Sequence, residues 1–430
     1  MKILLIGSGG REHALAWKLK QNPRVSLCSA PGSPALEALG EIRPEAVDNL
    51  QGLKDLALEI KPDLVVVGPE LPLVLGISDV LREAGFPVFG PSKLAARIEG
   101  SKVFAKDFMI RHNLPTANYA VFYDAQEAQN YLKDAAYPVV LKADGLAAGK
   151  GVVIAGKHAS ALNSLNSLTA TEAGKRIIVE EYLAGEEISF FGITDGKTIL
   201  PLPSAQDHKT IYDGDRGPNT GGMGAYSPAP LVTPKLQKLI LETILEPAIQ
   251  GLAVEGVPFC GLLYAGLMIT LSGPKLLEFN ARFGDPETQA LMPLLESDLA
   301  EIFLAAATGN LHSQKLEWSQ KSCACVVMSA SGYPGPYRQN DEITGLDKAS
   351  SREGVVVFEA GVGRKNGVPV TKGGRVLGVT ALGKNLKEAV DLAYEACGDI
   401  QFKGAYYRKD IGQKAFRQSL LYQDQDEKGL

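Results

Sequence analysis

Residues 276–288 read Leu-Leu-Glu-Phe-Asn-Ala-Arg-Phe-Gly-Asp-Pro-Glu-Thr. Side chains alternate between the two faces of a strand, so Glu278 and Asn280 are predicted to share one face, with Leu277 and Phe279 on the other. A carboxylate and an amide oxygen suit Mg²⁺, whose remaining positions are filled by phosphates and water. Arg282 follows, placed to neutralise charge on a transferring phosphoryl group or an acyl oxyanion. The alternative interpretation is an ordinary amphipathic edge strand.

Residues 139–154 read Val-Val-Leu-Lys-Ala-Asp-Gly-Leu-Ala-Ala-Gly-Lys-Gly-Val-Val-Ile, which predicts two strands, Val139–Ala143 and Val152–Ala155, joined by a glycine-rich tip. This is not a phosphate-binding P-loop, because Asp144 stands where that motif has glycine, Gly151 stands where it has Ser or Thr, and no helix follows. The tip is expected to fold over a triphosphate, with Lys142 supplying a positive charge. A lysine within an apolar strand is costly to bury without a partner, which favours an anion there. The alternative is a surface hairpin with an extended lysine.

Residues 1–100 alternate short apolar runs with amphipathic stretches, which predicts a parallel sheet that binds ligands at the carboxyl ends of its strands. The first turn, Gly7-Ser8-Gly9-Gly10-Arg11-Glu12, suits a phosphate or a ribose at a helix N-terminus. A nicotinamide cofactor is disfavoured, because Glu12 replaces the third glycine of the dinucleotide motif and the acidic residue expected about 20 positions later is missing. The alternative is a tight turn needed only for packing.

The rest of the chain predicts further units. Strands are expected at Ile177–Glu181 and Ile188–Ile193 as a pair, a helix at Lys102–Arg111, and a helix at Pro234–Gly251. Residues 213–228 are predicted to form a long functional loop, and residues 320–415 a small β-rich domain with a helix at Leu386–Cys397. Between the two paired strands, Glu180-Glu181-Tyr182-Leu183 is expected to contact adenine and Glu187 the ribose; a solvated acidic surface is the alternative.

Composition restricts the class of protein. With 430 residues, 45% hydrophobic and 22% charged, the chain suits a globular protein of several domains. A net charge of −5 gives no attraction to nucleic acid, and no apolar run approaches the roughly 20 residues of a membrane helix. The five cysteines fit no zinc spacing, so we expect a reduced, cytoplasmic enzyme.

The chain resembles the glycinamide ribonucleotide synthetase family of ATP-grasp ligases over nearly its whole length. The matching stretches are Gly-Ser-Gly-Gly-Arg-Glu-His (7–13), Val-Gly-Pro-Glu (67–70), Glu-Gly-Ser-Lys (99–102), Lys-Ala-Asp-Gly-Leu-Ala-Ala-Gly-Lys-Gly-Val (142–152), Gln-Asp-His-Lys (206–209), Gly-Pro-Asn-Thr-Gly-Gly-Met-Gly-Ala-Tyr-Ser-Pro (217–228) and Arg-Phe-Gly-Asp-Pro-Glu-Thr-Gln (282–289). The last two are highly specific, whereas any ATP-grasp ligase would share the lysines, the linker and the 276–282 strand.

The resemblance implies a multidomain α/β and α+β fold: a Rossmann-like parallel-sheet domain over 1–101, an ATP-grasp domain over 102–316 with a mobile lid at about 116–182, and a β-rich domain over 317–425. It implies ATP-dependent joining of glycine to 5-phospho-D-ribosylamine through glycyl phosphate, a step of purine biosynthesis. It also implies a cytoplasmic monomer that uses Mg²⁺ or Mn²⁺ and contacts neither nucleic acid nor membrane.

The roles that the resemblance implies fall into four groups. The catalytic residues would be Lys142, Arg282 and Asp285. ATP would contact Lys102, Lys142, Gly149, Lys150, Gly151, Glu180, Glu181, Tyr182, Leu183 and Glu187. The other substrates would contact Gly9, Gly10, Arg11, Glu12, Glu70, Asp207, Lys209, Asn219, Thr220, Gly221, Gly222 and Asp285. The metal would be held by Glu278 and Asn280.

Two features depart from the family pattern. The segment 155–177 is short and lacks the usual glycine-rich turn, and Ala265-Gly266-Leu267 stands where many ATP-grasp enzymes carry a further acidic metal ligand. The remaining alternatives are another ATP-grasp carboxylate–amine ligase, for example one acting on formate or bicarbonate, an NAD-dependent oxidoreductase, and a non-enzymatic nucleotide-binding module. The missing ribose acid argues against the oxidoreductase, and the Glu278–Asn280–Arg282 pattern argues against the non-enzymatic module.

Overall fold

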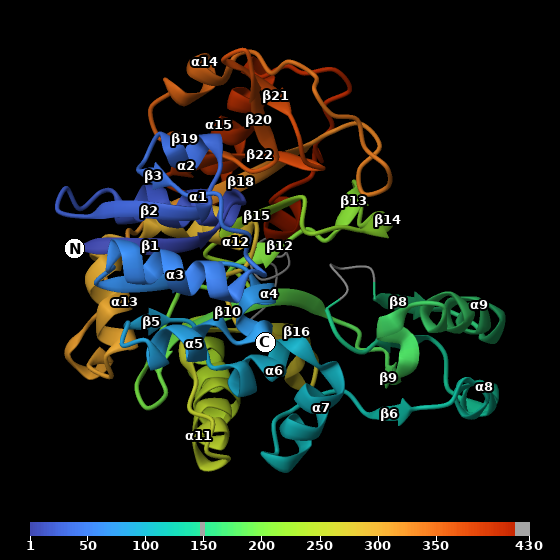
Figure 1. Ribbon diagram of the computed structural model, residues 1–430. Coiled ribbons are helices and arrows are strands. Elements are labelled where there is room, and N and C mark those ends of the chain that lie inside the picture. Colours follow the sequence, from blue (N-terminus) through green and yellow to red (C-terminus); the bar gives the residue numbers. More distant parts are fainter. Residues whose placement is uncertain (147–150, 418–430) are drawn as a thin grey trace.

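The N-terminal part is the predicted parallel sheet. The computed structural model describes residues 1–146 and 151–417, and its first sheet has the order β3-β2-β1-β4-β5 with every pair parallel (Figure 1). The strands are β1 (Lys2–Gly7), β2 (Ser26–Pro31), β3 (Glu41–Ile42), β4 (Leu64–Val67) and β5 (Val88–Phe89), and the helices are α1 (Gly10–Leu19), α2 (Pro34–Glu37), α3 (Leu50–Ile60), α4 (Glu70–Leu75) and α5 (Ile77–Glu83). All four residues of β4 are buried, as expected for a strand covered on both faces.

A separate small sheet forms the lid, at the right of Figure 1. It consists of β6 (Tyr119–Phe122), β9 (Ile177–Glu181), β7 (Val139–Ala143) and β8 (Val152–Ala155), in that spatial order, with α8 (Ala125–Asp134) and α9 (His158–Thr169) beside it. Leu132, Leu141 and Leu165 are among the residues of its buried core, which gives the lid packing of its own. Before the lid come α6 (Lys93–Gly100) and α7 (Lys102–Arg111).

The central sheet has the order β11-β10-β16-β17. Its elements are β10 (Glu186–Asp195), β11 (Ile199–Pro201), β16 (Cys260–Thr270) and β17 (Gly273–Asn280), accompanied by α10 (Pro234–Ile240), a π-helical turn (Leu241–Leu245), α11 (Glu246–Val254) and α13 (Leu299–Ala307). The expected pairing of 177–181 with 188–193 is wrong, because β9 belongs to the lid and β10 pairs with β16. The exposed segment from Tyr182 to Gly185 joins two sheets instead of closing a hairpin.

The C-terminal part is β-rich, as predicted, and lies at the top of Figure 1. Its main sheet has the order β12-β15-β18-β22-β19, built from β12 (Gln206–Asp207), β15 (Gly224–Ser227), β18 (Ser322–Ser329), β22 (Arg375–Gly383) and β19 (Val355–Glu359). Beside it are α14 (Leu346–Ser350), α15 (Leu386–Asp399) and the hairpins β13 (Thr210–Tyr212)–β14 (Arg216–Asn219) and β20 (Val362–Lys365)–β21 (Val368–Thr371). The predicted structureless loop over 213–228 is therefore wrong: part of it is β14, and part is β15, which pairs with β18 about a hundred residues away.

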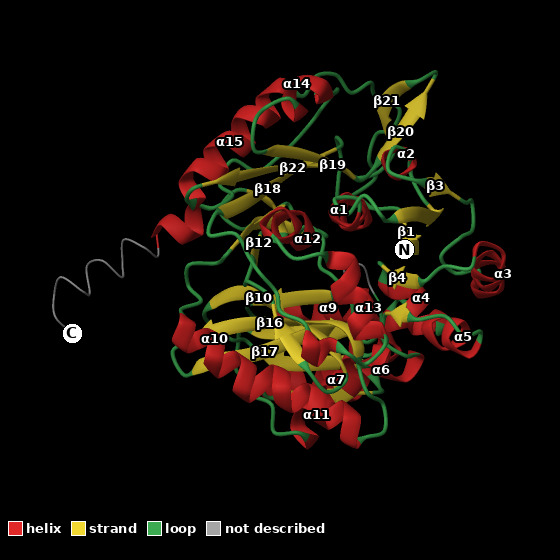
Figure 2. Ribbon diagram, turned by 90° about the vertical axis from the view of Figure 1, so that its left-hand side faces the viewer, coloured by secondary structure: helices red, strands yellow, loops and turns green. Residues whose placement is uncertain are grey.

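The hydrophobic core extends across the boundary between the N-terminal sheet and the central sheet. One buried cluster joins Leu4 and Val67 of the first sheet to Phe190 and Leu263 of the central sheet, so the N-terminal sheet is packed onto the central sheet. Figure 2 shows the central sheet below the C-terminal one, with α12 (Glu287–Leu291) between them. Among residues 1–146 and 151–417, no helix is long and apolar enough to cross a membrane.

Candidate active site

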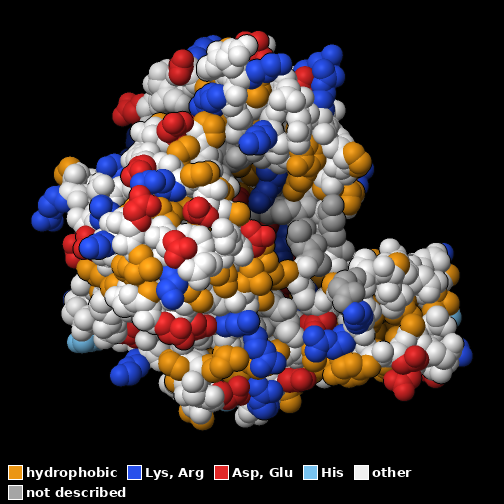
Figure 3. Space-filling model, viewed as in Figure 1, with side chains coloured by type: hydrophobic (Ala, Val, Ile, Leu, Met, Phe, Trp, Pro, Cys, Tyr) orange, Lys and Arg blue, Asp and Glu red, His pale blue; other side chains and the backbone are white. Residues whose placement is uncertain are grey.

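The parts of the chain surround a hollow between the C-terminal part and the lid, and basic side chains are visible inside it (Figure 3). Residues that contact one another here come from the carboxyl ends of β1 and β4, from the end of β17, and from the start of β22, where Arg375 lies. Ligands of open α/β sheets bind at such carboxyl ends. The predicted site residues thus come from distant parts of the sequence to one region.

Lys142 lies on β7 and has a partner that the sequence did not indicate. Its Nζ is 2.9 Å from Oε1 of Glu180, and it donates a hydrogen bond of 3.3 Å to the carbonyl of Leu277. The other oxygen of Glu180 is 3.0 Å from Nζ of Lys106. The Glu180 side chain is therefore held in an ion cluster, whereas Tyr182 beyond it is exposed.

Lys209 lies between two predicted ligand residues. Its Nζ forms an ion pair with Oε1 of Glu187 and is 3.7 Å from Oε1 of Glu278. Burial opposes charge on Lys209, but Glu187 and Glu278 outweigh it and raise its pKa well above the usual value. Gly266 lies directly opposite Glu278 on β16, so the position of the expected additional acidic ligand has no side chain.

The donor set suits one divalent ion bound jointly with a ligand's oxygens. Glu278 and Asn280 do share a face of β17, and their strand partners are Gly266 and Tyr264. Burial would raise the pKa of Glu278, but Lys209 and Lys142 lower it, so the carboxylate is ionised and ready for a cation. Within the described part of the chain, no group of three or more His, Cys, Asp or Glu side chains could hold a metal. Phosphate oxygens would have to complete the coordination.

Arg282 is surrounded by carboxylates. Its Nε is 3.1 Å from Oε2 of Glu70, and its terminal NH2 nitrogen is 2.9 Å from Oε1 of Glu99. Burial alone would raise the pKa of Glu70, but Arg282 and Arg11 hold it at about 2. Glu99 also accepts a hydrogen bond of 2.7 Å from the backbone N–H of Ala281. The guanidinium is thus fixed in position by two carboxylates.

Asp285 is held by an arginine that sequence reasoning missed. Arg375 donates to the backbone carbonyls of Asp285 (2.7 Å) and Gly221 (2.5 Å), and its terminal NH2 nitrogen is 3.4 Å from the Asp285 carboxylate. Gly221 also donates to the hydroxyl of Tyr333 at 3.0 Å. Arg375 therefore joins the 219–222 segment to Asp285.

The rest of that segment is anchored by the backbone. Thr220 donates to the carbonyl of Lys209 through both its N–H (2.7 Å) and its hydroxyl (2.9 Å). Gly222 has φ +111°, and a Cβ there would lie 2.8 Å from Oδ1 of Asp207, so only glycine permits this approach. Asn219, by contrast, is exposed on β14.

In the turn between β1 and α1, the carboxylate of Glu12 occupies the helix N-terminus. Oε2 of Glu12 accepts a hydrogen bond of 2.6 Å from the N–H of Gly9, and Oε1 is 2.6 Å from Nε of Arg11. The N-terminus of α1 is thus already capped by a carboxylate. A Cβ on Gly10 would lie 2.8 Å from the Gln289 side chain, which shows how closely α1 approaches α12.

The lid contacts the first turn of α7. Asp144 accepts hydrogen bonds from the hydroxyl of Ser101 (3.0 Å) and the N–H of Val103 (3.1 Å), and it pairs with Arg176 at 2.5 Å. Nζ of Lys102 donates to the carbonyl of Gly145 at 2.9 Å, so this predicted phosphate ligand also contacts the base of the tip.

The other residues that are predicted to contact ATP differ in their burial and contacts. The Glu181 side chain binds Asn118, where the chain enters the lid, through contacts of 2.9 and 3.1 Å. Leu183 is partly buried in the linker and Gly151 is buried at the start of β8, whereas Gly149 and Lys150 lie outside the described residues.

The residues that sequence reasoning missed are Glu99, Lys106 and Arg375. Two signals were present: Glu99 stands in the Glu-Gly-Ser-Lys match, and Lys106 follows Lys102 by four residues on a helix, so both lie on one face. Nothing in the local pattern marked Arg375.

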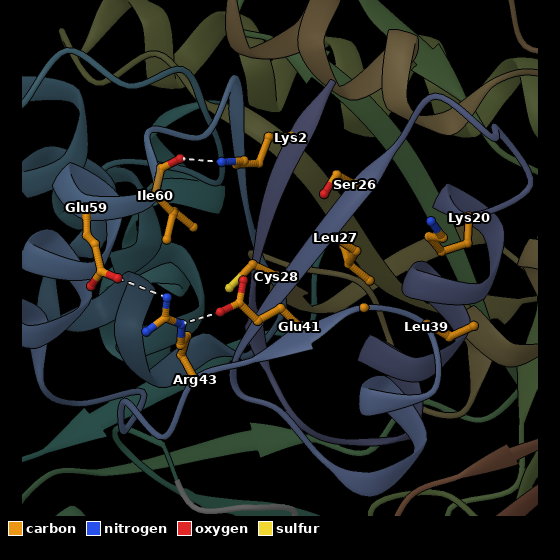
Figure 4. A pocket seen from close by; sticks show the side chains of 11 residues that line it. Lys2, Lys20, Ser26, Leu27, Cys28, Leu39, Glu41, Arg43, Glu59 and Ile60 are labelled. Atoms are coloured by element: carbon orange, nitrogen blue, oxygen red, sulfur yellow. Dashed lines mark hydrogen bonds and ion pairs between the residues drawn. The ribbon is translucent and has the colours of Figure 1, made fainter.

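A different cavity, of about 390 Å³, lies near the opposite ends of β1 and β2, where Lys2, Ser26 and Cys28 are among its lining residues (Figure 4). Arg43 pairs there with Glu41 (2.7 Å) and Glu59 (2.9 Å), and Lys2 donates to the carbonyl of Ile60 at 2.9 Å. We assign it no part in the site.

A parallel-sheet domain, a lid joined to a central antiparallel sheet, paired lysines and a Glu-x-Asn strand together define the ATP-grasp class of protein. Models of the phosphoribosylglycinamide synthetase family match three consecutive regions: the N domain at residues 1–99, the ATP-grasp domain at 100–288 and the C domain at 323–414. The chain belongs to this family.

Relatives match over nearly the full length. The chain is 50% identical to a phosphoribosylamine–glycine ligase of Rhizobium meliloti and 51% identical to one of Allochromatium vinosum, in each case over 96% of this chain and 99% of the relative. A crystal structure of a phosphoribosylamine–glycine ligase from Thermotoga maritima superposes with a TM-score of 0.84 at 34% identity and covers 96% of this chain and all of that one. The biotin carboxylase domain of a Hydrogenobacter thermophilus carboxylase (TM-score 0.73, 16% identity, 94% and 91% covered) shares the fold. The predicted family and fold class are confirmed.

Proposed function

We propose that this chain ligates glycine to 5-phospho-D-ribosylamine at the expense of ATP, giving glycinamide ribonucleotide, ADP and phosphate in purine biosynthesis. The observation that carries the proposal is the identity of about half of all residues, over 96% of the chain, with relatives named for this reaction. The site supports it, because it places cationic side chains, one carboxylate–amide pair and a backbone-anchored loop around one hollow.

A carboxylate does not acylate an amine, so one oxygen of glycine must first take the γ-phosphoryl group of ATP, forming glycyl phosphate and ADP. The amine nitrogen of phosphoribosylamine then attacks the carbonyl carbon, loses a proton and displaces phosphate. Lys102 and Lys142 bind the ATP phosphates, and Arg282, fixed by Glu70 and Glu99, faces the charge that develops on the transferred group. The lid excludes water from the labile acyl phosphate.

Glu278 and Asn280 would hold the divalent metal, Mg²⁺ or Mn²⁺, whose charge stabilises the phosphate oxygens during transfer. Asp285 and the 219–222 segment, joined by Arg375, would line the acyl-phosphate site, and Asp207 and the turn from Gly9 to Glu12 would also contact the substrates. Glu187 and the backbone of the linker from Glu180 to Leu183 would hold adenosine. We further propose that the protein is a cytoplasmic monomer with three domains, at residues 1–101, 102–316 and 317–425.

The test is an omission assay on the purified protein with ATP, Mg²⁺, glycine and phosphoribosylamine. ADP is expected only when all four are present. Equal ADP release with formate or bicarbonate in place of glycine would instead favour another carboxylate–amine ligase of the ATP-grasp class.

A further inference from the structure

Two lysines share one buried carboxylate beneath the proposed phosphate site. Lys106 of α7 and Lys142 of β7 each contact a different oxygen of Glu180, at 3.0 and 2.9 Å. The side chains of Lys106 and Glu180 are 2% exposed and that of Lys142 is 8% exposed. The cluster is therefore enclosed, and its slightly more open end is Lys142.

The charges in this cluster do not balance. Glu180 can neutralise only one of the two ammonium groups, and the other contacts are neutral: Lys106 donates to the hydroxyl of Thr116 at 2.7 Å and Lys142 to the carbonyl of Leu277. Glu278 acts on both lysines from a greater distance, but it is shared among Lys209, Lys142, Lys102 and Arg282 and does not neutralise the cluster alone. Burial lowers the pKa of Lys106 to about 8 even though Glu180 opposes the shift. A buried excess charge is costly unless a ligand compensates it.

We propose that Lys106 is a positioning residue: it shares Glu180 with Lys142 and so leaves the positive charge of Lys142 partly uncompensated for the phosphates of ATP. By engaging one oxygen of Glu180, Lys106 prevents that carboxylate from neutralising Lys142 completely. The inference rests on the proposed ATP site and deepens it: α7 supplies Lys102 as a direct phosphate ligand, and Lys106, one turn later, acts through Glu180.

A purely structural role makes a different prediction. Lys106 also braces the point where the chain enters the lid, because Thr116 passes a hydrogen bond on to the carbonyl of Leu276 at 2.7 Å. If bracing were its only role, the loss of any cluster member would weaken the fold. Restoring the charge balance in a double variant would then not restore binding of the ATP phosphates.

The experiment compares the wild type with Lys106→Met, Glu180→Gln and the double variant. The dissociation constants of MgATP and adenosine are measured by titration calorimetry, and their ratio isolates the contribution of the phosphates. Lys106→Met leaves a neutral Lys142–Glu180 pair, so the phosphate contribution should fall by about tenfold or more while adenosine binding stays near normal. Lys106→Gln, which keeps a donor to Glu180, should show the same fall.

The double variant restores the balance of the wild type, because it removes one positive and one negative charge. The ratio of its dissociation constants for MgATP and adenosine should return most of the way to the wild-type ratio. Lys348→Met is the matched control: Lys348 also shares a carboxylate, that of Asp399, with a second cation, Arg352, but it is largely exposed and far from the site in sequence. This control should leave the ratio unchanged.

An unchanged ratio in folded Lys106→Met and Lys106→Gln would overturn the inference while leaving the ATP site intact. A double variant weaker than either single variant would also overturn it, in favour of bracing. Failure of the folded wild type to bind MgATP at all would overturn the ATP site and this inference together.

Discussion

The carboxylate of Asp144, at the base of the lid tip, accepts a hydrogen bond of 3.1 Å from the backbone N–H of Val103 in the first turn of α7. An acid from the lid thus caps a helix that lies outside the lid. Ser101, which caps the same helix through Phe104, also donates to Asp144. This contact joins the lid to the helix that carries Lys102 and Lys106.

Replacing Asp144 with Ala is expected to loosen this contact without unfolding the lid. The buried N–H of Val103 would lose its partner, which costs about 1–3 kcal/mol. Amide hydrogen exchange at residues 102–104 should accelerate. Asp124→Ala is the control, since Asp124 caps α8 within the lid through Gln126 and Glu127 and should accelerate exchange only there. Unaltered exchange at 102–104 in Asp144→Ala would contradict the contact.

Glu278→Gln should abolish metal binding while preserving the fold. Lys209 keeps Glu187 as a partner, so no buried charge is left alone. Turnover is expected to fall by about 100-fold or more, because a bound metal stabilises transition-state charge by several kcal/mol. The binding of Mn²⁺ in the presence of ATP, followed by electron paramagnetic resonance, should weaken in parallel.

The control is Glu242→Gln, which removes a carboxylate paired with Lys238 on an exposed helix face and should change neither quantity. Mn²⁺ binding of normal strength in Glu278→Gln would place the metal elsewhere.

Glu70 should make stability depend on pH in acid. Arg282 and Arg11 outweigh burial and hold its folded pKa at about 2, below the usual value of 4.5. The ionised form is therefore favoured by folding, and its contribution is complete above pH 4.5 and lost as the pH falls towards 2. Urea unfolding of the wild type and Glu70→Gln should show a stability difference that shrinks between pH 5 and pH 3. A difference independent of pH would show that Glu70 is not held by the arginines.

Local elements were predictable where local pattern controls structure. The strands Val139–Ala143 and Val152–Ala155 and the helix Lys102–Arg111 form with the predicted boundaries, because alternation, glycine at the turn and a Ser101 cap all act within a few residues. The shared face of Glu278 and Asn280 follows from strand geometry in the same way.

Pairing between distant segments was not predictable. The Gly-Ala-Tyr-Ser stretch at 224–227 has three residues of weak strand propensity and becomes a strand because it pairs with β18. Likewise, the sequence indicated an anion for Lys142, but tertiary packing brings Glu180 and Lys106 to it. Partners of buried charges depend on which elements meet, and the pattern of one segment does not contain that information.

The most direct test of the account follows the oxygen atoms of glycine. With glycine labelled by ¹⁸O in both carboxylate oxygens, the released phosphate should carry one ¹⁸O atom and the amide product should retain the other, since one oxygen leaves with the phosphoryl group. Mass spectrometry of both products measures this. Phosphate without ¹⁸O, formed along with ADP, would contradict ligation through glycyl phosphate.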